Sequence, residues 1–247
     1  MWESSGLPRH QEDWNALARL DPLFAIRADK GKRGGRWTLE DFLATGREEV
    51  EAVVGYLKER APDLRFDAAL DFGCGVGRLT VPLCSYWRSV VGVDISEEMV
   101  SLAERYHGNR PGVRFVHNDR VDLAVFGDGT FDFVYSNITL MHIPHEPAIE
   151  RYVRDFVRVL RPGGYTLFQL PTRLPLLQRI KLRRALYHVL ARAGLPPEFL
   201  YHRLRLHPVK MRQVPRSRLE GWILPGARVA DVTNEGCEET RYLVRKV

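Results

Sequence analysis

Apolar and polar residues follow two different periods along this chain, and the two periods alternate. From about residue 66 onward, short apolar runs bounded by Gly, Asp or Asn are each followed by a stretch with apolar residues at helical spacing. This order is typical of a doubly wound, mostly parallel α/β sheet. The expected strands are 66–71, 89–94, 113–117, 131–136 and 165–170, and the expected helices between them are 78–87, 96–107 and 146–160.

The two ends of the chain carry further elements. Before the sheet, the pattern predicts a helix from about residue 11, a basic linker over 29–36, a short helix capped by Thr38, and a longer helix over 47–60 that Pro62 ends. The elements expected after the sheet are a helix over 217–223 and strands over 227–233 and 240–245, which read as a hairpin.

The composition is that of a globular protein. The chain has 247 residues, of which 45% are hydrophobic, and this is enough for one large α/β domain. Its three cysteines, Cys74, Cys84 and Cys237, form no Cys-x-x-Cys pair, which disfavours a zinc site or a disulfide scaffold. We see no signal peptide pattern at the N-terminus and no apolar run long enough to span a membrane. We therefore expect a cytoplasmic protein.

Positive charge is concentrated in one segment. The net charge is +6, yet between Thr172 and Arg218 there are twelve Lys and Arg residues and one acidic residue, Glu198. Apolar residues recur there at helical spacing and the arginines fall mostly elsewhere, which predicts a cationic amphipathic helix near 182–193. We expect residues 173–192 to contact an anionic or lipid-like substrate, an acidic partner or a membrane surface. A solvated helix that packs by its leucine stripe is an equally open interpretation.

One glycine-rich stretch carries the candidate chemistry. Residues 69–78 read Ala-Leu-Asp-Phe-Gly-Cys-Gly-Val-Gly-Arg, an apolar strand that ends in Asp71 and turns tightly into a helix. Backbone N–H groups at the helix start and a carboxylate at the strand tip suit a ligand with hydroxyls and an amino group. A dinucleotide fingerprint would need glycine where Arg78 stands, and Asp71 would repel a phosphate. A glycine turn without a ligand is the other interpretation.

The spacing of this stretch resembles motif I of the class I S-adenosylmethionine-dependent methyltransferases, which is acidic-x-Gly-x-Gly-x-Gly. Further stretches resemble later motifs of that family, in the same order, across residues 66–171. They are Val93-Asp94-Ile95-Ser96 with Met99, Asn118-Asp119, 131–136 followed by 140–144, and Leu160-Arg161-Pro162-Gly163-Gly164. The resemblance implies a Rossmann-like, seven-stranded sheet whose last strand is antiparallel. It also implies an N-terminal helical lid or extension over 1–62, and a methyltransferase domain over 63–247 with a basic helical cap inserted at 172–215.

The resemblance further implies that S-adenosylmethionine binds across the carboxyl ends of the first strands. Asp94 would accept hydrogen bonds from the ribose hydroxyls and Asp119 from the adenine amino group. Asp71 would hold the amino group of the methionine end, directly or through water. A purely structural role at a turn or helix start is the alternative. The expected cofactor contacts are Asp71, Gly73, Cys74, Gly75, Gly77, Asp94, Ile95, Met99, Asn118, Asp119, Arg120, Ser136 and Arg47, the last of them at the cofactor carboxylate. For Arg47 a surface or packing role is at least equally open.

Methyl transfer requires alignment of nucleophile, methyl group and sulfur, and a base helps where the acceptor is a hydroxyl. His142 follows the fourth expected strand and is the candidate base, with a structural role equally open. His145 lies three residues further on, but no other ligand group supports a metal site.

The residues after the fourth expected strand narrow the choice of acceptor. Methyltransferases of this superfamily that act on exocyclic base amines carry Asn-Pro-Pro-Tyr or Asp-Pro-Pro-Tyr there, whereas 136–139 read Ser-Asn-Ile-Thr. We therefore expect methyl transfer to a hydroxyl or amine of a small molecule. The alternatives are an RNA methyltransferase, which the basic net charge favours, a binding protein that keeps the fold without catalysis, and a nucleotide-dependent oxidoreductase.

Overall fold

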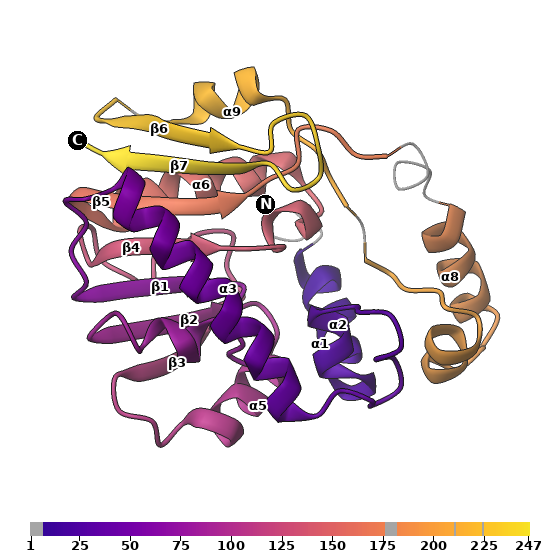
Figure 1. Ribbon diagram of the computed structural model, residues 1–247. Helices are drawn as coiled ribbons and strands as arrows, with labels where there is room; N and C mark the ends of the chain where they lie inside the picture. Colours follow the sequence, from indigo (N-terminus) through magenta and orange to yellow (C-terminus); the bar gives the residue numbers. More distant parts are fainter. Residues whose placement is uncertain (1–6, 176–181, 210, 224) are drawn as a thin grey trace.

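In the computed structural model, which describes residues 7–175, 182–209, 211–223 and 225–247, seven strands form one sheet. The strand order is β3-β2-β1-β4-β5-β7-β6 (Figure 1), and β7 runs antiparallel to both of its neighbours while the other pairs are parallel. The strands are β1 (Ala68–Phe72), β2 (Ser89–Asp94), β3 (Val113–His117), β4 (Phe131–Ser136), β5 (Leu160–Gln169), β6 (Ala227–Thr233) and β7 (Arg241–Lys246). The predicted doubly wound sheet with an antiparallel last strand is confirmed.

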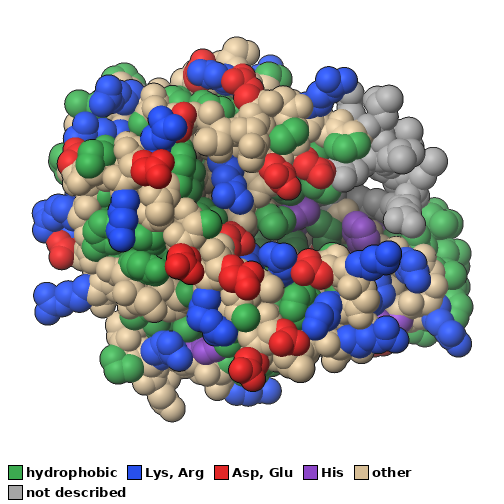
Figure 2. Space-filling view, viewed as in Figure 1, with side chains coloured by type: hydrophobic (Ala, Val, Ile, Leu, Met, Phe, Trp, Pro, Cys, Tyr) green, Lys and Arg blue, Asp and Glu red, His purple; other side chains and the backbone are tan. Residues whose placement is uncertain are grey.

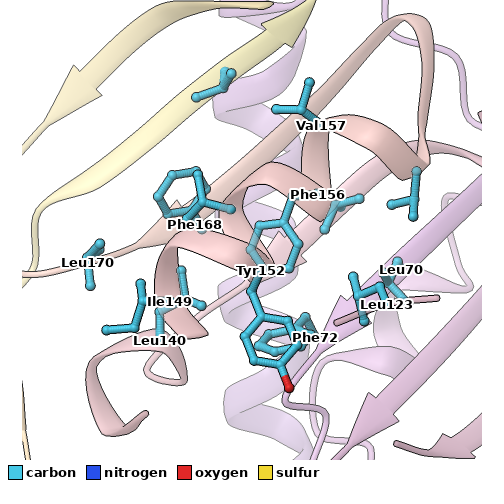
Figure 3. Close-up of a cluster of buried hydrophobic side chains, with 14 of the residues drawn as sticks. Leu70, Phe72, Leu123, Leu140, Ile149, Tyr152, Phe156, Val157, Phe168 and Leu170 are labelled. Carbon is cyan, nitrogen blue, oxygen red and sulfur yellow. The ribbon is translucent and has the colours of Figure 1, made fainter. Parts of the chain in front are cut away.

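Helices cover both faces of the sheet, because successive side chains of a strand point to opposite sides. Leu70 and Phe72 of β1 pack with α6 (Glu146–Val159) and α9 (Arg216–Trp222) in one buried cluster (Figure 3). Ala69 points the other way, into a second cluster. That cluster contains the inner faces of α3 (Leu39–Arg60) and α4 (Thr80–Leu83). The end of β1, where the glycine turn begins, is therefore held from both sides.

Residues 39–60 form one continuous helix, α3, where the sequence predicted a short helix and a second one from residue 47. Thr38 caps it as expected, since the Asp41 N–H donates to Thr38 Oγ1 at 3.1 Å. Gly46 lies inside this helix. A Cβ at Gly46 would lie 2.0 Å from the carbonyl oxygen of Arg78, so the glycine allows α3 to approach the turn after β1.

The strands β2, β3 and β4 have the predicted bounds, whereas β5 and α4 differ. β5 begins at Leu160, which pairs with Phe131 before a bulge, so the turn expected before this strand is part of it. α4 is shorter than the predicted helix 78–87 because the preceding residues stay in tight turns. One of these is closed by the Gly77 N–H, which donates to the Cys74 carbonyl at 2.9 Å.

The N-terminal helices and the basic segment lie beyond the carboxyl ends of the parallel strands (Figure 1). The elements there are α1 (Leu7–Leu20), α2 (Pro22–Ile26), α8 (Leu182–Arg192) and η3 (Phe199–Arg203). α1 packs against α5 (Glu97–His107), where Ser96 Oγ donates to Asn15 Oδ1 at 2.7 Å. These elements stand where a ligand of such a sheet would bind.

Part of the basic segment lies outside the described residues. This holds for 176–181, which include Arg179, and for the side chains of 182–184. No helix in the described ranges is both long enough and apolar enough to cross a bilayer.

Candidate active site

A cavity of about 560 Å³ lies at the carboxyl ends of the parallel strands. Most of its lining comes from the glycine turn after β1, the ends of β2 and β4 with their following loops, the helices α1 and α2, and η3 with the segment after it. A pocket of this size can hold a nucleoside-sized ligand together with a small second molecule. Its position is the one expected for a ligand of a doubly wound sheet.

The glycine turn folds back onto the end of β2. The N–H groups of Gly73 and Cys74 both donate to the Val93 carbonyl, at 2.8 and 3.1 Å. Gly73 and Gly75 have φ values of +77° and +53°, in the left-handed region that glycine adopts without strain. A Cβ at Gly75 would lie 2.5 Å from the Ile26 side chain, so the turn leaves room only for backbone at the cavity wall.

Asp94 joins the turn to the next helix. Its Oδ2 accepts from the Gly75 N–H at 2.8 Å and its Oδ1 accepts from the Ser96 N–H at 2.9 Å. Burial raises the pKa of Asp94, and these backbone donors oppose that rise. Since each carboxylate oxygen can accept more than one hydrogen bond, Asp94 keeps capacity for hydroxyl groups of a ligand in the cavity it lines.

Asp71 lies beneath the turn and does not line the cavity. Its buried carboxylate accepts from Thr80 Oγ1 at 2.6 Å. Burial, as the dominant cause, raises the pKa of Asp71 to about 7. Asp71 therefore does not reach the cavity for the direct contact with the ligand's amino group, and the expected contact through water stays a prediction.

Arg78 presents a buried cation to the cavity. Its side chain is 5% exposed and donates from Nη2 to Glu49 Oε2 at 2.8 Å. Glu49 also accepts from the Tyr135 hydroxyl at 2.9 Å and from the Asn137 amide at 2.6 Å. Arg78 Nε and Nη1 are buried without a hydrogen-bond partner among the described residues. Two unsatisfied cationic donors at a cavity indicate an anionic group of a ligand.

Arg47, the residue expected at the cofactor carboxylate, lies elsewhere. It is exposed on α3 and borders a separate cavity of about 100 Å³ together with Ser85 and Arg110. In the sequence, Arg78 served only to exclude a dinucleotide. Its position directly after the glycine turn was a signal that could have marked it as a residue of the cavity wall.

The remaining predicted residues divide into two groups. Of the lining residues, Gly73, Cys74, Gly75, Asp94, Ile95, Met99 and Asn118 were predicted cofactor contacts, and His142 was the predicted base. Gly77 and Ser136 are buried behind the wall, and Asp119 and Arg120 are exposed beyond Asn118. Arg120 instead pairs with Asp122 at 3.0 Å.

The far wall of the cavity was not predicted. His142 lies in η2 (Leu140–His142), and its ring meets the edge of Trp14 of α1 with centroids 5.8 Å apart. Trp14 also contacts His10, one turn earlier, at 6.2 Å. The residues of η3 and of the segment after it that complete this wall are Tyr201, His207, Val209 and Met211. This wall joins apolar surface to imidazoles, and its parts come from segments that are far apart in the sequence.

Contacts of two residues, Arg33 and Arg212, hold the far wall together. The Arg33 guanidinium lies 4.7 Å from the Phe24 ring centroid and 4.8 Å from that of Tyr201, and it donates to the Tyr201 carbonyl at 2.7 Å. The Arg212 N–H donates to the Met141 carbonyl at 2.8 Å. The N-terminal segment and the segment after η3 are thereby tied to each other and to the end of β4.

Comparison with known proteins finds similarity over the central part of the chain. Residues 70–168 match a family model described as a methyltransferase domain. Phosphoethanolamine N-methyltransferase of Triticum aestivum is 35% identical over 130 residues, 52% of this chain and 24% of that protein. Demethylmenaquinone methyltransferase of Staphylococcus aureus (strain MRSA252) is 34% identical over 122 residues, 48% of each. The chain thus spans between a quarter and half of the length of these relatives.

Solved structures show the same fold. Magnesium protoporphyrin IX methyltransferase from Synechocystis PCC 6803, with bound SAH, superposes with a TM-score of 0.61 at 20% identity over 98% of this chain and 99% of that one. Phosphoethanolamine N-methyltransferase 1 of Haemonchus contortus gives a TM-score of 0.63 at 15% identity, over 98% of this chain and 49% of that one.

The strand order, the glycine turn and the cavity at the strand ends define a methyltransferase domain of the class I architecture. The match of residues 70–168 to a methyltransferase-domain model agrees with this architecture. Proteins of this architecture, such as the one solved with bound SAH, use S-adenosylmethionine as the methyl donor.

Proposed function

We propose that this protein transfers the methyl group of S-adenosylmethionine to a small-molecule acceptor held against the far wall of the cavity. The observation that carries this proposal is that one cavity joins the glycine turn, Asp94 and Asn118 at one end to His142 and Trp14 at the other. A cofactor and an acceptor bound at the two ends would meet inside it, as an in-line displacement requires.

The residues of the near end fit the cofactor. Asp94 would accept from the ribose hydroxyls, and Ile95 and Met99 would pack against the adenine ring, with Asn118 at its edge. Asp119, exposed beyond Asn118, would meet the adenine amino group if its loop turns inward. The backbone of the glycine turn would lie along the methionine end. We assign the cofactor carboxylate to Arg78, because its two unpartnered donors are buried at this end.

The chain's own part in the reaction is alignment and proton removal. S-adenosylmethionine supplies a methyl carbon on a positively charged sulfur. A lone pair of the acceptor would form the new bond to that carbon while the carbon–sulfur bond breaks and its electron pair stays on sulfur. The acceptor's proton would pass to His142, whose ring is held by the Trp14 edge. The apolar lining would keep water from this step.

The far wall favours an apolar acceptor with an acidic hydroxyl over a charged amine. Among the described lining residues, the only carboxylates are Asp94, at the cofactor end, and Asp29, which is paired with Arg27 at 2.9 Å. An ammonium group would therefore find no carboxylate at the far wall to pair with. The demethylmenaquinone of one relative's name is closer in chemistry to this wall than the phosphoethanolamine of the other.

Calorimetry followed by product analysis tests the proposal. The wild type should bind S-adenosylmethionine and its demethylated product, and Asp94→Ala should weaken both by roughly 10- to 100-fold, since a charged hydrogen-bond acceptor is lost. Labelled methyl donor and a metabolite extract should then give a methylated small molecule. A wild type that ignores both ligands would refute the cofactor assignment. Binding without product from any extract, or product only on RNA, would refute the acceptor assignment.

A further inference from the structure

The helix α8 turns its apolar side outward. Leu186 is 49% exposed and Val189 is 62% exposed, and Ala185 and Ala193 are exposed beside them. These four residues, the outer stripe, recur at helical spacing and so form one continuous face. A surface helix normally buries such a stripe against its own protein.

The opposite side of α8 is the side that packs on the protein. Arg9 of α1 donates from Nη2 to His188 Nδ1 at 2.9 Å. Tyr187 is half-buried, and its burial, with the nearby charge of Asp13, raises its pKa. α8 therefore uses polar and aromatic side chains to join the N-terminal helix, and its outer stripe has no partner among the described residues.

Exposed cations lie on α8 and at the end of η3, which contacts α8. Arg192 of α8 and Arg203 and Arg205 at the end of η3 are exposed and make no ion pair with a described residue. Phe199 and Leu204, between them in the chain, are 45% and 42% exposed. Figure 2 shows hydrophobic side chains along the outer edge of this part of the molecule, with Lys and Arg side chains beside them.

We propose that the outer stripe docks on an anionic bilayer surface. Its apolar side chains would enter the boundary between headgroups and acyl chains, and the unpaired arginines would bind lipid phosphates. A second copy of the chain fits less well, because Arg192, Arg203 and Arg205 would meet their own counterparts across a symmetric contact. The segment that follows the stripe supplies Tyr201 and His207 to the cavity, so docking would place the cavity beside the membrane.

Co-sedimentation with vesicles tests this directly and needs no methyl acceptor. The wild type should bind vesicles of phosphatidylcholine mixed with phosphatidylglycerol, and bind weakly to phosphatidylcholine alone, with affinity falling as salt rises. Leu186→Gln combined with Val189→Gln should weaken binding by roughly 10- to 100-fold, since two apolar side chains no longer enter the bilayer. Val125→Gln is the matched control, because Val125 is also 49% exposed but lies in the loop between β3 and β4.

Two further measurements keep the test decisive. Thermal unfolding of the double variant should match that of the wild type, because both substituted residues are exposed and Gln is a good helix former. Arg192→Gln combined with Arg203→Gln should reduce the salt dependence. A wild type that binds neither vesicle type, or a double variant that binds as well as the wild type, would overturn the proposal. A wild-type dimer that becomes monomeric in the double variant would overturn it as well, in favour of self-association.

Discussion

At the scale of single residues, Arg78 stands out because two of its buried donor atoms have no hydrogen-bond partner among the described residues. Its guanidinium has one carboxylate partner and two buried donors with none. Arg78→Gln should weaken binding of S-adenosylhomocysteine by roughly 10- to 100-fold, since a charge-assisted pair with the ligand's carboxylate is lost. Calorimetry with methylthioadenosine, which has no amino-acid carboxylate, is the control. Wild type and variant should bind it alike, and an equal loss for both ligands would contradict the assignment.

Asp71 gives the folded protein a pH dependence of known sign. Its pKa in the folded state is about 7, above the ordinary value of 3.8, because the carboxyl is buried. The folded state therefore holds a proton that the unfolded state releases, and this group makes folding less favourable as pH rises from about 4 to about 7. Asp71→Asn keeps an acceptor for the Thr80 hydroxyl and cannot ionise.

Urea unfolding at several pH values measures this effect. The stability of Asp71→Asn relative to the wild type should increase as pH rises through that window and then level off. Comparing the two proteins cancels the contributions of their other titrating groups. A difference that stays flat with pH would show that Asp71 ionises in the folded protein at its ordinary pKa.

Among the elements, the glycine turn offers a matched pair of substitutions. Gly73 and Gly163 have nearly equal φ values, +77° and +79°. A Cβ at Gly73 would lie 2.2 Å from the Thr139 side chain, whereas a Cβ at Gly163 would have no atom within 4 Å. Both changes to Ala should cost about 1–2 kcal/mol for the left-handed backbone. Gly73→Ala should cost about 1–3 kcal/mol more for the clash.

Denaturant unfolding of the two variants separates these contributions. Calorimetry should also show weaker S-adenosylhomocysteine binding in Gly73→Ala, since the turn must move to relieve the clash, and unchanged binding in Gly163→Ala. Equal losses of stability in both variants would mean that the Thr139 side chain rotates away and that only the backbone angle matters.

The sequence predicted elements well where local pattern decides them. β2, β3 and β4 alternate or run apolar between clear turn residues, and their bounds agree with the structure. Gly46 in α3 and Leu160 in β5 depend on contacts with residues far along the chain, and the pattern placed those boundaries wrongly. The glycine turn and Asp94 were found from spacing, but the unpaired donors of Arg78 appear only once α3 is packed beside the turn.

The orientation of α8 also depends on contacts with residues far along the chain, so the local pattern could not predict it. Helical spacing identified an apolar stripe, which an isolated pattern cannot orient relative to the rest of the protein. The contact between Arg9 and His188 orients the helix, and it joins residues 179 positions apart. The basic linker expected over 29–36 is likewise a structured loop, since Asp21 accepts from the N–H groups of Gly34 and Gly35 at 2.7 and 3.2 Å.

At the scale of the whole molecule, the cavity is closed by segments that the sheet does not contain. We propose that residues 7–36 act as a lid and that η3 with the segment after it acts as a cap. Arg33 links the two through its contacts with Phe24 and Tyr201. A guanidinium between two aromatic rings is a strong link when it is half-buried, so its loss should let the lid and cap separate.

Arg33→Gln should therefore speed the dissociation of S-adenosylhomocysteine by roughly 5- to 50-fold, as expected for a lost cation–π and hydrogen-bond contact. Stopped-flow displacement measures the rate, and hydrogen exchange should show less protection in 7–36 while the sheet stays protected. Arg19→Gln is the control, since Arg19 also belongs to the lid but makes an exposed ion pair with Glu98 that contributes little. If both variants release the ligand at the wild-type rate while 7–36 exchanges faster in Arg33→Gln, the lid moves without controlling the cofactor. Its role would then be confined to the wall that Trp14 and His142 form around the acceptor.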